Sequence, residues 1–552
     1  MSSTSRRWFA LTIALVAVAA GAGCSSSTSK AATATDPTTT APAADERPAC
    51  TPRAAEKITA TPVAGSDTDF DVTSFDGTTI RAHWFPVDDA AADGAPTVLK
   101  GPGWGLAGDV NTEGSGYGLF GDLSINSLNG EGYNVLTWDP RGFGASTGTV
   151  ETNSPDFEGR DVQQLIDWVA TQPGVELDAT NDPRMGMVGA SYGGGIQLTV
   201  ASIDCRVDAI VPQLAWNSLG TSLYKNDTAK TGWGNLLYGV AGEHTLDPHI
   251  TSAHTESNES GVISPADVEW FVSRGPGDDV GNITAPTLFE QGTIDTLFSL
   301  DEAVSNYTIL KDKGVPTAML WMCSGHGVCL TDPGDQRLPG TAALAWLNRY
   351  VKDDTSVSVG PEFRYVDQNG VGHAAGGYPI DGQGLVMSSK KPVSLTLTAG
   401  GGAGPAVAPG DAGALGGIAL PITPGRADHA ANVTFTFDAS VNIVGAPHLD
   451  LTYRGTSPPG ERPTRVFAQL VDDKTGLVLG NQITPIEVTL DGKEHTASLP
   501  LETVVYTGVR GSRLTLQLVA TTVSYAEPRL GGTIDFNSVQ LGLPAVSGNR
   551  AG

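Results

Sequence analysis

The pentapeptide Gly189-Ala190-Ser191-Tyr192-Gly193 constrains the folding of this chain of 552 residues more than any other feature. It overlaps the end of the apolar run RMGMVGAS (184–191) and directly precedes a helical pattern, which predicts a strand, a sharp turn and a helix in succession. In a G-x-S-x-G turn of this kind the serine backbone is strained, and small neighbours let strand and helix pack closely. A small-residue turn without chemistry is the alternative interpretation, but the strand-turn-helix context favours Ser191 as a nucleophile.

The region from residue 56 to residue 354 alternates short apolar runs with helical patterns. Strands are expected over six segments: 96–101, 133–139, 184–191, 208–214, 285–292 and 316–322. Helices are expected over three segments: 161–172, 301–314 and 341–353. Continuous apolar strands separated by amphipathic helices are typical of βαβ units, so the sequence predicts an α/β domain with a mostly parallel sheet.

Two regions depart from this alternation. Residues 216–281 contain Gly, Asn, Thr, His and scattered Trp without a bounded strand run, which indicates an inserted cap. Over 355–552 the pattern changes to alternating strands, which predicts an all-β sandwich or jelly-roll domain. These strands are expected at 431–440, 465–473, 512–523 and 532–542. The Gly-rich run 398–417 inside this domain is expected to be a flexible loop.

A serine hydroxyl becomes a good nucleophile only when a neighbouring base takes its proton and a third group orients that base. In folds with this serine turn the chain order is Ser, acid, His. Asp295 follows the strand at 285–292, and His326 follows the strand at 316–322. The other eight of the nine histidines precede Ser191, lie in the cap or fall in the β-rich region. Asp301 and Glu302 compete with Asp295, but they open a helix, where acidic residues are common. The sequence therefore predicts a triad of Ser191, Asp295 and His326.

Acyl transfer also needs hydrogen-bond donors for the developing oxyanion, usually from the residue after the nucleophile and from an earlier strand-end loop. Here these are Tyr192 and, in the loop GPGWG (101–105), Trp104 or Gly103; an ordinary Gly/Pro turn is the alternative for this loop. A G-x-G-x-x-G match at 116–121 does not directly follow a strand, so no dinucleotide site is expected. Without an H-E-x-x-H or a paired C-x-x-C motif, the sequence predicts neither a metal site nor another cofactor.

The N-terminus predicts export. Residues 1–23 combine an arginine pair with an apolar run too short to span a bilayer as a helix, and they resemble a twin-arginine signal peptide. Residues 21–24 resemble a lipobox, so lipid attachment at Cys24 is expected, with an ordinary secretory signal as the alternative. Residues 24–55, rich in Ser, Thr, Ala and Pro, are expected to form a flexible tether. The protein is therefore expected at the outer face of the cell membrane, held through a lipid anchor, or secreted.

Export also favours disulfides, and four cysteines remain if Cys24 carries lipid. The preferred pairing is Cys323–Cys329 with Cys50–Cys205; the two other pairings and four free thiols are the alternatives. The chain has 33 Lys and Arg against 60 Asp and Glu, a net charge of −27, which argues against nucleic acid as a partner. A small-molecule ester, amide or peptide is the expected partner.

Several strings together resemble one family, the CocE/NonD and Xaa-Pro dipeptidyl-peptidase (S15-like) serine hydrolases. They are DPRGFGASTG (139–148), GASYGG (189–194), GTID (292–295), GHG (325–327) and LVDD (470–473). The resemblance covers most of residues 56–548, and it implies an α/β-hydrolase core with a helical cap, a C-terminal jelly-roll domain and cleavage of esters or amides through a serine acyl-enzyme. One departure is that many members have a tyrosine, a hydroxyl donor to the oxyanion, after the proline of the 101–105 loop. Here Pro102 is followed by Gly103, so backbone N–H groups or the indole N–H of Trp104 would have to substitute.

Three kinds of function are compatible with these features. The first is a serine hydrolase of esters or amides, of which a carboxylesterase is favoured and an amide hydrolase is the alternative. An Xaa-Pro dipeptidyl peptidase would need carboxylates for a free ammonium, and no motif selects among the cap residues Glu243, Asp267 and Glu269. A surface-tethered protein that binds glycan or protein through its β domain, with a vestigial hydrolase core, is the third hypothesis, and the complete triad order argues against it.

Overall fold

A computed structural model describes residues 50–54, 57–88, 90–114, 116–410 and 412–546. The predicted signal peptide and Cys24 lie outside these residues, as does most of the predicted tether. In the part of the chain that the structure describes, no helix combines the length and the apolar character needed to cross a membrane.

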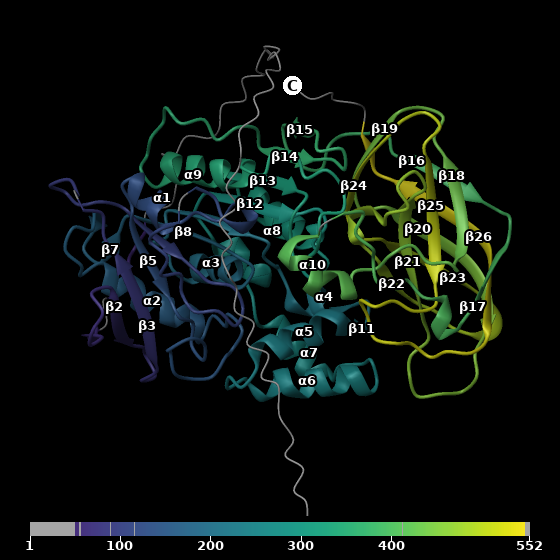
Figure 1. Cartoon of the computed structure of the whole chain (residues 1–552), viewed down its shortest axis with the longest axis horizontal. Helices are drawn as coiled ribbons and strands as arrows, with labels where there is room; N and C mark the ends of the chain where they lie inside the picture. The colour runs from purple at the N-terminus through teal and green to yellow at the C-terminus, as the bar shows by residue number, and fades with distance from the viewer. Residues whose placement is uncertain (1–49, 55–56, 89, 115, 411, 547–552) are drawn as a thin grey trace, which may run out of the picture. The chain divides into compact units, whose positions relative to one another are not determined.

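An eleven-stranded sheet forms the core of the predicted α/β domain (Figure 1). Its strands are β1 (Ala60–Pro62), β2 (Asp69–Thr73), β3 (Thr79–Phe85), β4 (Thr97–Lys100), β5 (Asn134–Trp138), β8 (Met185–Ala190), β9 (Ala209–Gln213), β12 (Thr287–Gly292), β13 (Thr317–Met322), β14 (Phe363–Val366) and β15 (Gly372–Ala375). The spatial order is β1-β2-β3-β5-β4-β8-β9-β12-β13-β14-β15. The central run from β5 to β14 is parallel, whereas β1 to β3 and β15 pair antiparallel. The six expected strands correspond to β4, β5, β8, β9, β12 and β13.

Helices cover both faces of this sheet, which explains why its central strands are continuously apolar. One face packs against α1 (Ile125–Gly130) and α9 (Leu338–Tyr350). The other packs against α2 (Glu158–Val169), α3 (Tyr192–Ile203) and α8 (Leu300–Asp312). Successive strand residues serve opposite faces, because Val98 and Val135 pack with the first pair of helices and Leu99 and Leu136 with the second group. The α/β class is confirmed.

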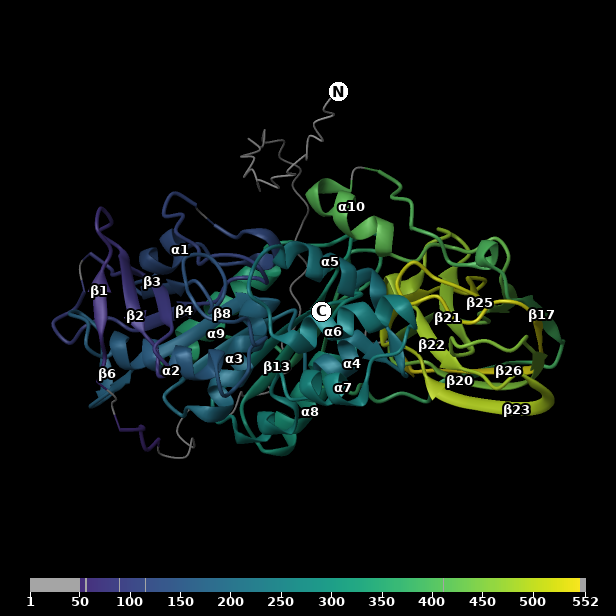
Figure 2. The ribbon, with the colours of Figure 1, turned by 90° about the horizontal axis from the view of Figure 1, so that it is seen from below.

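The segment between β9 and β12, predicted to be an inserted cap, is mostly helical (Figures 1 and 2). Its elements are α4 (Leu219–Leu223), β10 (Tyr224–Lys225), β11 (Thr228–Ala229), α5 (Thr231–Ala241), α6 (Pro248–Glu259), α7 (Pro265–Val272) and a 3₁₀ turn at Gly277–Asn282. Both α6 and α7 begin with proline after a capping residue: Asp247 accepts from the N–H of His249, and Ser264 from that of Asp267.

The C-terminal part is all-β and consists of three antiparallel sheets. Its strands are β16 (Leu385–Ser389), β17 (Val393–Thr396), β18 (Ala431–Thr436), β19 (Val441–Gly445), β20 (His448–Thr456), β21 (Arg465–Asp472), β22 (Thr484–Glu487), β23 (Asp491–Pro500), β24 (Val504–Gly508), β25 (Arg513–Val519), β26 (Thr533–Leu543) and β27 (Ala545–Val546). Alternate residues of these strands build a second hydrophobic core. The all-β class agrees with the expectation, and the jelly-roll connectivity stays a prediction.

Two expectations about boundaries need correction. Strands β14 and β15 extend the main sheet beyond the expected domain end at residue 354. No helix separates these two strands, so their pattern resembles that of the antiparallel region that follows. Near the end of the run 398–417, expected to be a loop, helix α10 (Gly413–Ala419) begins. Its last residue, Ala419, packs with Val328 and Leu330 near the predicted catalytic histidine, so tertiary contacts order a run of low helix propensity.

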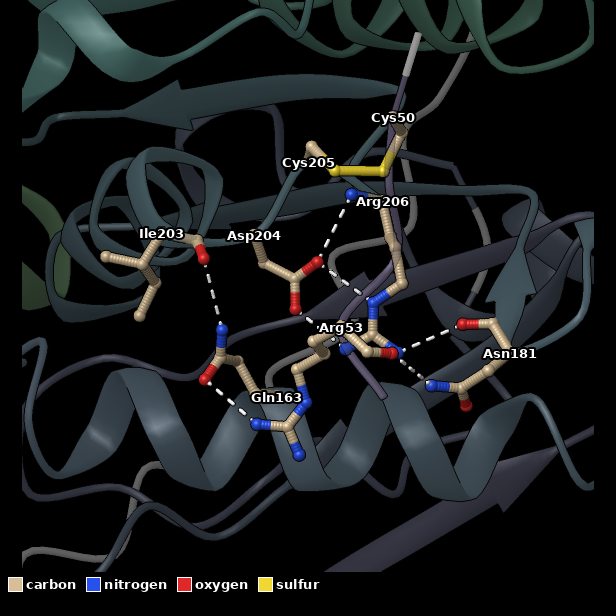
Figure 3. The surroundings of a disulfide bond; sticks show 8 residues. All are labelled: Cys50, Arg53, Gln163, Asn181, Ile203, Asp204, Cys205 and Arg206. Carbon is tan, nitrogen blue, oxygen red and sulfur yellow. Dashed lines mark hydrogen bonds and ion pairs between the residues drawn. A yellow bond between two sulfur atoms is a disulfide. The ribbon is translucent and has the colours of Figure 1, made fainter. Parts of the chain in front are cut away.

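The structure contains both preferred disulfides, Cys50–Cys205 and Cys323–Cys329. Figure 3 shows the first, which ties the start of the described chain to the segment after α3. Beside it the guanidinium of Arg206 is fully buried and donates to Asp204 at 2.7 Å and to Asp167 at 2.6 Å. A buried guanidinium needs such paired acceptors, so the disulfide is attached to a rigid part of the core.

Two short strands and four further 3₁₀ turns complete the described elements. They are β6 (Leu177–Ala179), β7 (Asp182–Pro183), and turns at Leu119–Gly121, Ala399–Gly401, Leu420–Ile422 and Leu479–Asn481, the last labelled η6.

Candidate active site

Ser191 lies at the sharp turn between β8 and α3, as the pentapeptide predicts. Its φ of 59° and ψ of −118° are strained for a residue with a side chain. The turn also requires glycine at position 193, where a Cβ atom would lie 2.2 Å from the carbonyl oxygen of Gly101. Glycine therefore allows the 101–105 loop after β4 to pass directly beside the serine.

The structure brings together the three residues of the predicted triad. His326 follows β13, and its Nε2 atom lies 2.7 Å from the Oγ atom of Ser191. The Nδ1 atom of the same ring lies 2.7 Å from Oδ2 of Asp295, which follows β12. With the proton on Nδ1, the imidazole donates to the carboxylate and its Nε2 accepts from the serine hydroxyl. Hydrogen bonds thus link the Ser191 hydroxyl to the imidazole and the imidazole to the Asp295 carboxylate, the arrangement in which a histidine can accept a proton from a serine.

The carboxylate of Asp295 is fully buried and held by backbone groups. Its Oδ1 atom accepts from the N–H groups of Leu297 at 3.0 Å and Phe298 at 2.8 Å, which fixes the direction in which Oδ2 points. The competing acids are engaged elsewhere: the hydroxyl of Thr503 donates to Asp301, and the N–H of Asn217 donates to Glu302. The geometry therefore favours Asp295 as the partner of the histidine.

Two side chains of the all-β part hold the loops that carry the acid and the histidine. Gln482 donates to the backbone carbonyl of Asp295 at 2.8 Å, and Asn481 donates to that of Val328 at 2.9 Å. Asn481 lies in the turn η6 and has a φ of 58°, an uncommon backbone conformation. The side-chain amides of Asn481 and Gln482 are both buried against the loops that carry Asp295 and His326. Sequence reasoning missed both residues, because no motif marks a contact between segments so far apart.

The disulfide Cys323–Cys329 closes a short ring around His326. A short ring adds little chain-entropy stabilisation, whereas a long one adds more. We expect the double variant Cys323→Ser/Cys329→Ser to lose activity several-fold while its Tm changes little, since the histidine loop loses its restraint. Steady-state kinetics and thermal unfolding of the two proteins measure this.

The matched control is Cys50→Ser/Cys205→Ser, which opens a disulfide with a sequence separation of 155, located after the end of α3 opposite Ser191. We expect the opposite pattern from it, a lower Tm with kcat retained. Equal activity of the Cys323/Cys329 double variant and the wild type would refute a role for the short ring.

Of the predicted oxyanion donors, Tyr192 directly follows Ser191 at the start of α3, and Trp104 lines the same cavity as Ser191. The N–H of Tyr192 is the first of α3 and has no acceptor within the helix. The indole N–H of Trp104 donates to the carbonyl of Leu237 in the cap at 3.0 Å, so this predicted donor is already engaged. The backbone N–H groups of Gly103 and Trp104 stay the predicted second donors.

An apolar cavity beneath the cap opens onto Ser191. Its apolar wall is formed by Trp104, Trp216, Leu219, Leu223, Ala229, Leu237, Ile250, Ala253, Ile263, Phe271, Leu297 and Phe298. Among the described residues that line it, none is Asp or Glu, and its one lysine is Lys230. Lys230 is buried and donates to the carbonyl of Leu297 at 3.0 Å, and burial lowers the pKa of its ammonium group.

The acids expected to bind a substrate ammonium do not line this cavity. Glu243 and Glu269 are exposed on the cap, and Asp267 pairs with His249 at 2.6 Å. The described residues that line the cavity therefore offer an ammonium group no carboxylate.

Residues 76–327 match the family model described as X-Pro dipeptidyl-peptidase (S15 family). An uncharacterized 31.7 kDa protein of Escherichia coli, from the traX-finO intergenic region, is 34% identical over 91 residues, 16% of this chain and 30% of that protein. The polyketide transferase grgF of Penicillium is 27% identical over 158 residues, 28% of this chain and 46% of that protein. The chain thus spans less than half the length of these curated relatives.

Solved structures show the same fold. A CocE/NonD family hydrolase from Staphylococcus aureus has a TM-score of 0.62 at 14% identity, covering 93% of this chain and 99% of its own. An α-amino acid ester hydrolase has a TM-score of 0.59 at 15% identity, covering 93% of this chain and 100% of its own. The resemblance to S15 and CocE/NonD hydrolases that the motifs indicated is confirmed.

Proposed function

With the S15 family match over residues 76–327 as the premise, we propose that this protein is an exported serine hydrolase that cleaves carboxylic esters with an apolar acyl group. The observation that carries the proposal is the hydrogen-bonded path from Ser191 through His326 to Asp295, located at the mouth of an apolar cavity. The disulfides Cys50–Cys205 and Cys323–Cys329 support export, because such bonds persist in oxidising compartments.

The reaction proceeds through an acyl-enzyme. The Ser191 oxygen attacks the ester carbonyl while its proton moves to Nε2 of His326, and Asp295 stabilises the resulting imidazolium. The oxyanion accepts a hydrogen bond from the N–H of Tyr192. The bond to the alcohol breaks and the alcohol takes the proton from His326. Water then attacks the acyl-enzyme by the same route, releasing the carboxylic acid and restoring Ser191.

An Xaa-Pro dipeptidyl peptidase is the second candidate, because the matching family model carries that description. Such an enzyme must bind a free ammonium at the end of its substrate, and a buried ammonium without a charge partner costs several kcal/mol. The cavity wall contains Lys230 and no carboxylate among its described residues. This argues for an uncharged acyl group.

The comparison that tests this is kcat/KM for p-nitrophenyl butyrate, for alanyl-prolyl p-nitroanilide and for its N-acetylated form. We expect turnover of the ester and poor turnover of both anilides, because the wall offers apolar contacts and no ammonium partner. Good turnover of the free-amine anilide that acetylation abolishes would contradict the esterase proposal and favour the peptidase.

A binding protein with a vestigial hydrolase core makes a different prediction. A fluorophosphonate probe reacts only with an activated serine, so it should label the wild-type protein at Ser191. A folded protein that neither reacts with the probe nor hydrolyses the ester would favour the binding protein.

A further inference from the structure

The imidazole of His326 contacts two aromatic rings in addition to its hydrogen-bond partners in the triad. The ring of Phe298 lies 5.1 Å from it, centroid to centroid, at an interplanar angle of 88°. The indole of Trp233 lies 5.8 Å from it at 85°. Both are edge-to-face arrangements at separations that aromatic pairs prefer, so each ring opposes rotation of the imidazole. Phe298 belongs to the acid loop (295–298), whereas Trp233 comes from helix α5 of the cap.

Trp233 is buried, and its own position is fixed by the acid loop. Its indole N–H donates to Oγ1 of Thr296, the residue after the catalytic acid, at 3.0 Å. The ammonium group of Lys230, which directly precedes α5, donates to the carbonyl of Leu297 at 3.0 Å. The start of α5 therefore bonds to two consecutive residues of the acid loop, and Trp233 contacts this loop and His326 at once.

The segment 523–524 of the all-β part holds the start of α5 as well. The N–H of Gly232 donates to the carbonyl of Ser524 at 3.1 Å. A Cβ atom at position 232 would lie 2.9 Å from the carbonyl oxygen of Val523, so glycine allows this close approach. Contacts with both the acid loop and the all-β part therefore fix the indole of Trp233 beside the imidazole.

The hydrogen bonds of His326 change during the proposed reaction, whereas the two aromatic rings take no part in proton transfer. In the free enzyme Nε2 accepts from the Ser191 hydroxyl and Nδ1 donates to Asp295. In the acyl-enzyme the Ser191 oxygen carries the acyl group and has no proton to donate. The imidazole then loses one of its two hydrogen bonds within the triad, at the stage where Nε2 must accept a proton from water.

We propose that Trp233 is a positioning residue for His326, whose indole holds the imidazole in the orientation that hydrolysis of the acyl-enzyme requires. This rests on the proposed hydrolase function. Trp233 acts through His326 and is not among the described residues that line the cavity. Its loss therefore slows proton transfer in the acyl-enzyme more than it weakens ester binding.

Two variants of Trp233 test the ring. Trp233→Leu removes it, whereas Trp233→Phe keeps an aromatic ring and loses the indole N–H. For Trp233→Leu we expect the rate constant of deacylation with p-nitrophenyl butyrate to fall about 10-fold to 10²-fold, and that of acylation to fall less. The butyryl-enzyme should accumulate, which gives a burst of p-nitrophenolate and a lower KM. Trp233→Phe should keep both rate constants within a few-fold of the wild type. Stopped-flow kinetics and mass spectrometry of the quenched protein measure these results.

The matched control is Trp270→Leu. Trp270, on the cap helix α7, is also buried and also packs against a histidine, His249, with ring centroids 5.4 Å apart. His249 is bonded to Asp267 rather than to an acid of the triad. Both leucine variants remove a buried indole from the cap, so both should lower the Tm. Only Trp233→Leu should slow deacylation.

Several results would overturn the inference. They are wild-type deacylation in Trp233→Leu, equal slowing of acylation and deacylation, the same slowing in Trp270→Leu, and a loss in Trp233→Phe as large as in Trp233→Leu. If Trp233→Leu does not fold, Trp233→Met, whose side chain adapts to irregular space, takes its place with the same outcomes. A wild-type protein without ester turnover or fluorophosphonate labelling would overturn the proposed function. An active wild type with an equally active Trp233→Leu would overturn only the role of Trp233.

Discussion

Ser191→Ala is expected to lower kcat on p-nitrophenyl butyrate by at least about 10³-fold, because the attacking oxygen is removed and the imidazole of His326 has no proton to accept. The change removes only the side-chain oxygen of Ser191. The glycine residues that let the turn form are unchanged, so the Tm should stay close to that of the wild type. Steady-state kinetics and labelling with a fluorophosphonate measure the result, and labelling should disappear.

Ser202→Ala is the matched control for this variant. Ser202 lies on the same helix α3, and its hydroxyl donates to the backbone carbonyl of Thr199 at 2.8 Å, away from the cavity. It should retain wild-type kcat and labelling. Activity of Ser191→Ala within a few-fold of the wild type would refute Ser191 as the nucleophile.

Asp295→Asn is expected to lower kcat by about 10⁴-fold. The N–H groups of Leu297 and Phe298 hold an oxygen at the Oδ1 position, so the new amide nitrogen occupies the Oδ2 position and faces Nδ1 of His326. Nδ1 must then accept a hydrogen bond, which places the ring proton on Nε2, where it prevents proton transfer from Ser191. The expected effect is on kcat, and KM should change little because Asp295 does not line the cavity.

Asp301→Asn distinguishes this effect from a general loss of negative charge. Asp301 lies on α8 in contact with Thr503 of the all-β part, and burial together with the neighbouring carboxylate of Glu502 raises the pKa of Asp301. A neutral side chain is therefore tolerated there, and we expect wild-type kcat. A larger loss in Asp301→Asn than in Asp295→Asn would reassign the acid.

Short-range patterns were sufficient to predict the main elements around the site. The run before Ser191 is apolar at every position because helices bury both faces of β8, and this marks it as a central strand. Asp295 and His326 follow β12 and β13 in the order expected after a serine turn. Since the carboxyl ends of parallel strands meet at one edge of a sheet, a local pattern and a chain order together bring the three residues near one another.

The end of the α/β domain was predicted less well, because it depends on which neighbouring strand each strand pairs with. β14 and β15 are short and follow each other without a helix, so their sequence resembles that of an antiparallel domain. Pairing of β14 with β13 assigns them to the main sheet instead. Likewise, α10 is ordered by the contact of Ala419 with Val328 and Leu330, which its Gly-rich sequence does not reveal.

By itself the sequence predicted the α/β class, the serine turn and the chain order of the candidate triad, because each follows from local periodicity or spacing, and it favoured one pairing of the cysteines over the alternatives. Only the tertiary structure decided that Gln482 and Asn481 donate hydrogen bonds to the backbone carbonyls of the loops that carry Asp295 and His326. The tertiary structure also decided that no carboxylate is present among the described residues of the cavity wall. These features arise where segments distant in the chain come into contact. A local sequence pattern does not predict which side chains will be neighbours there.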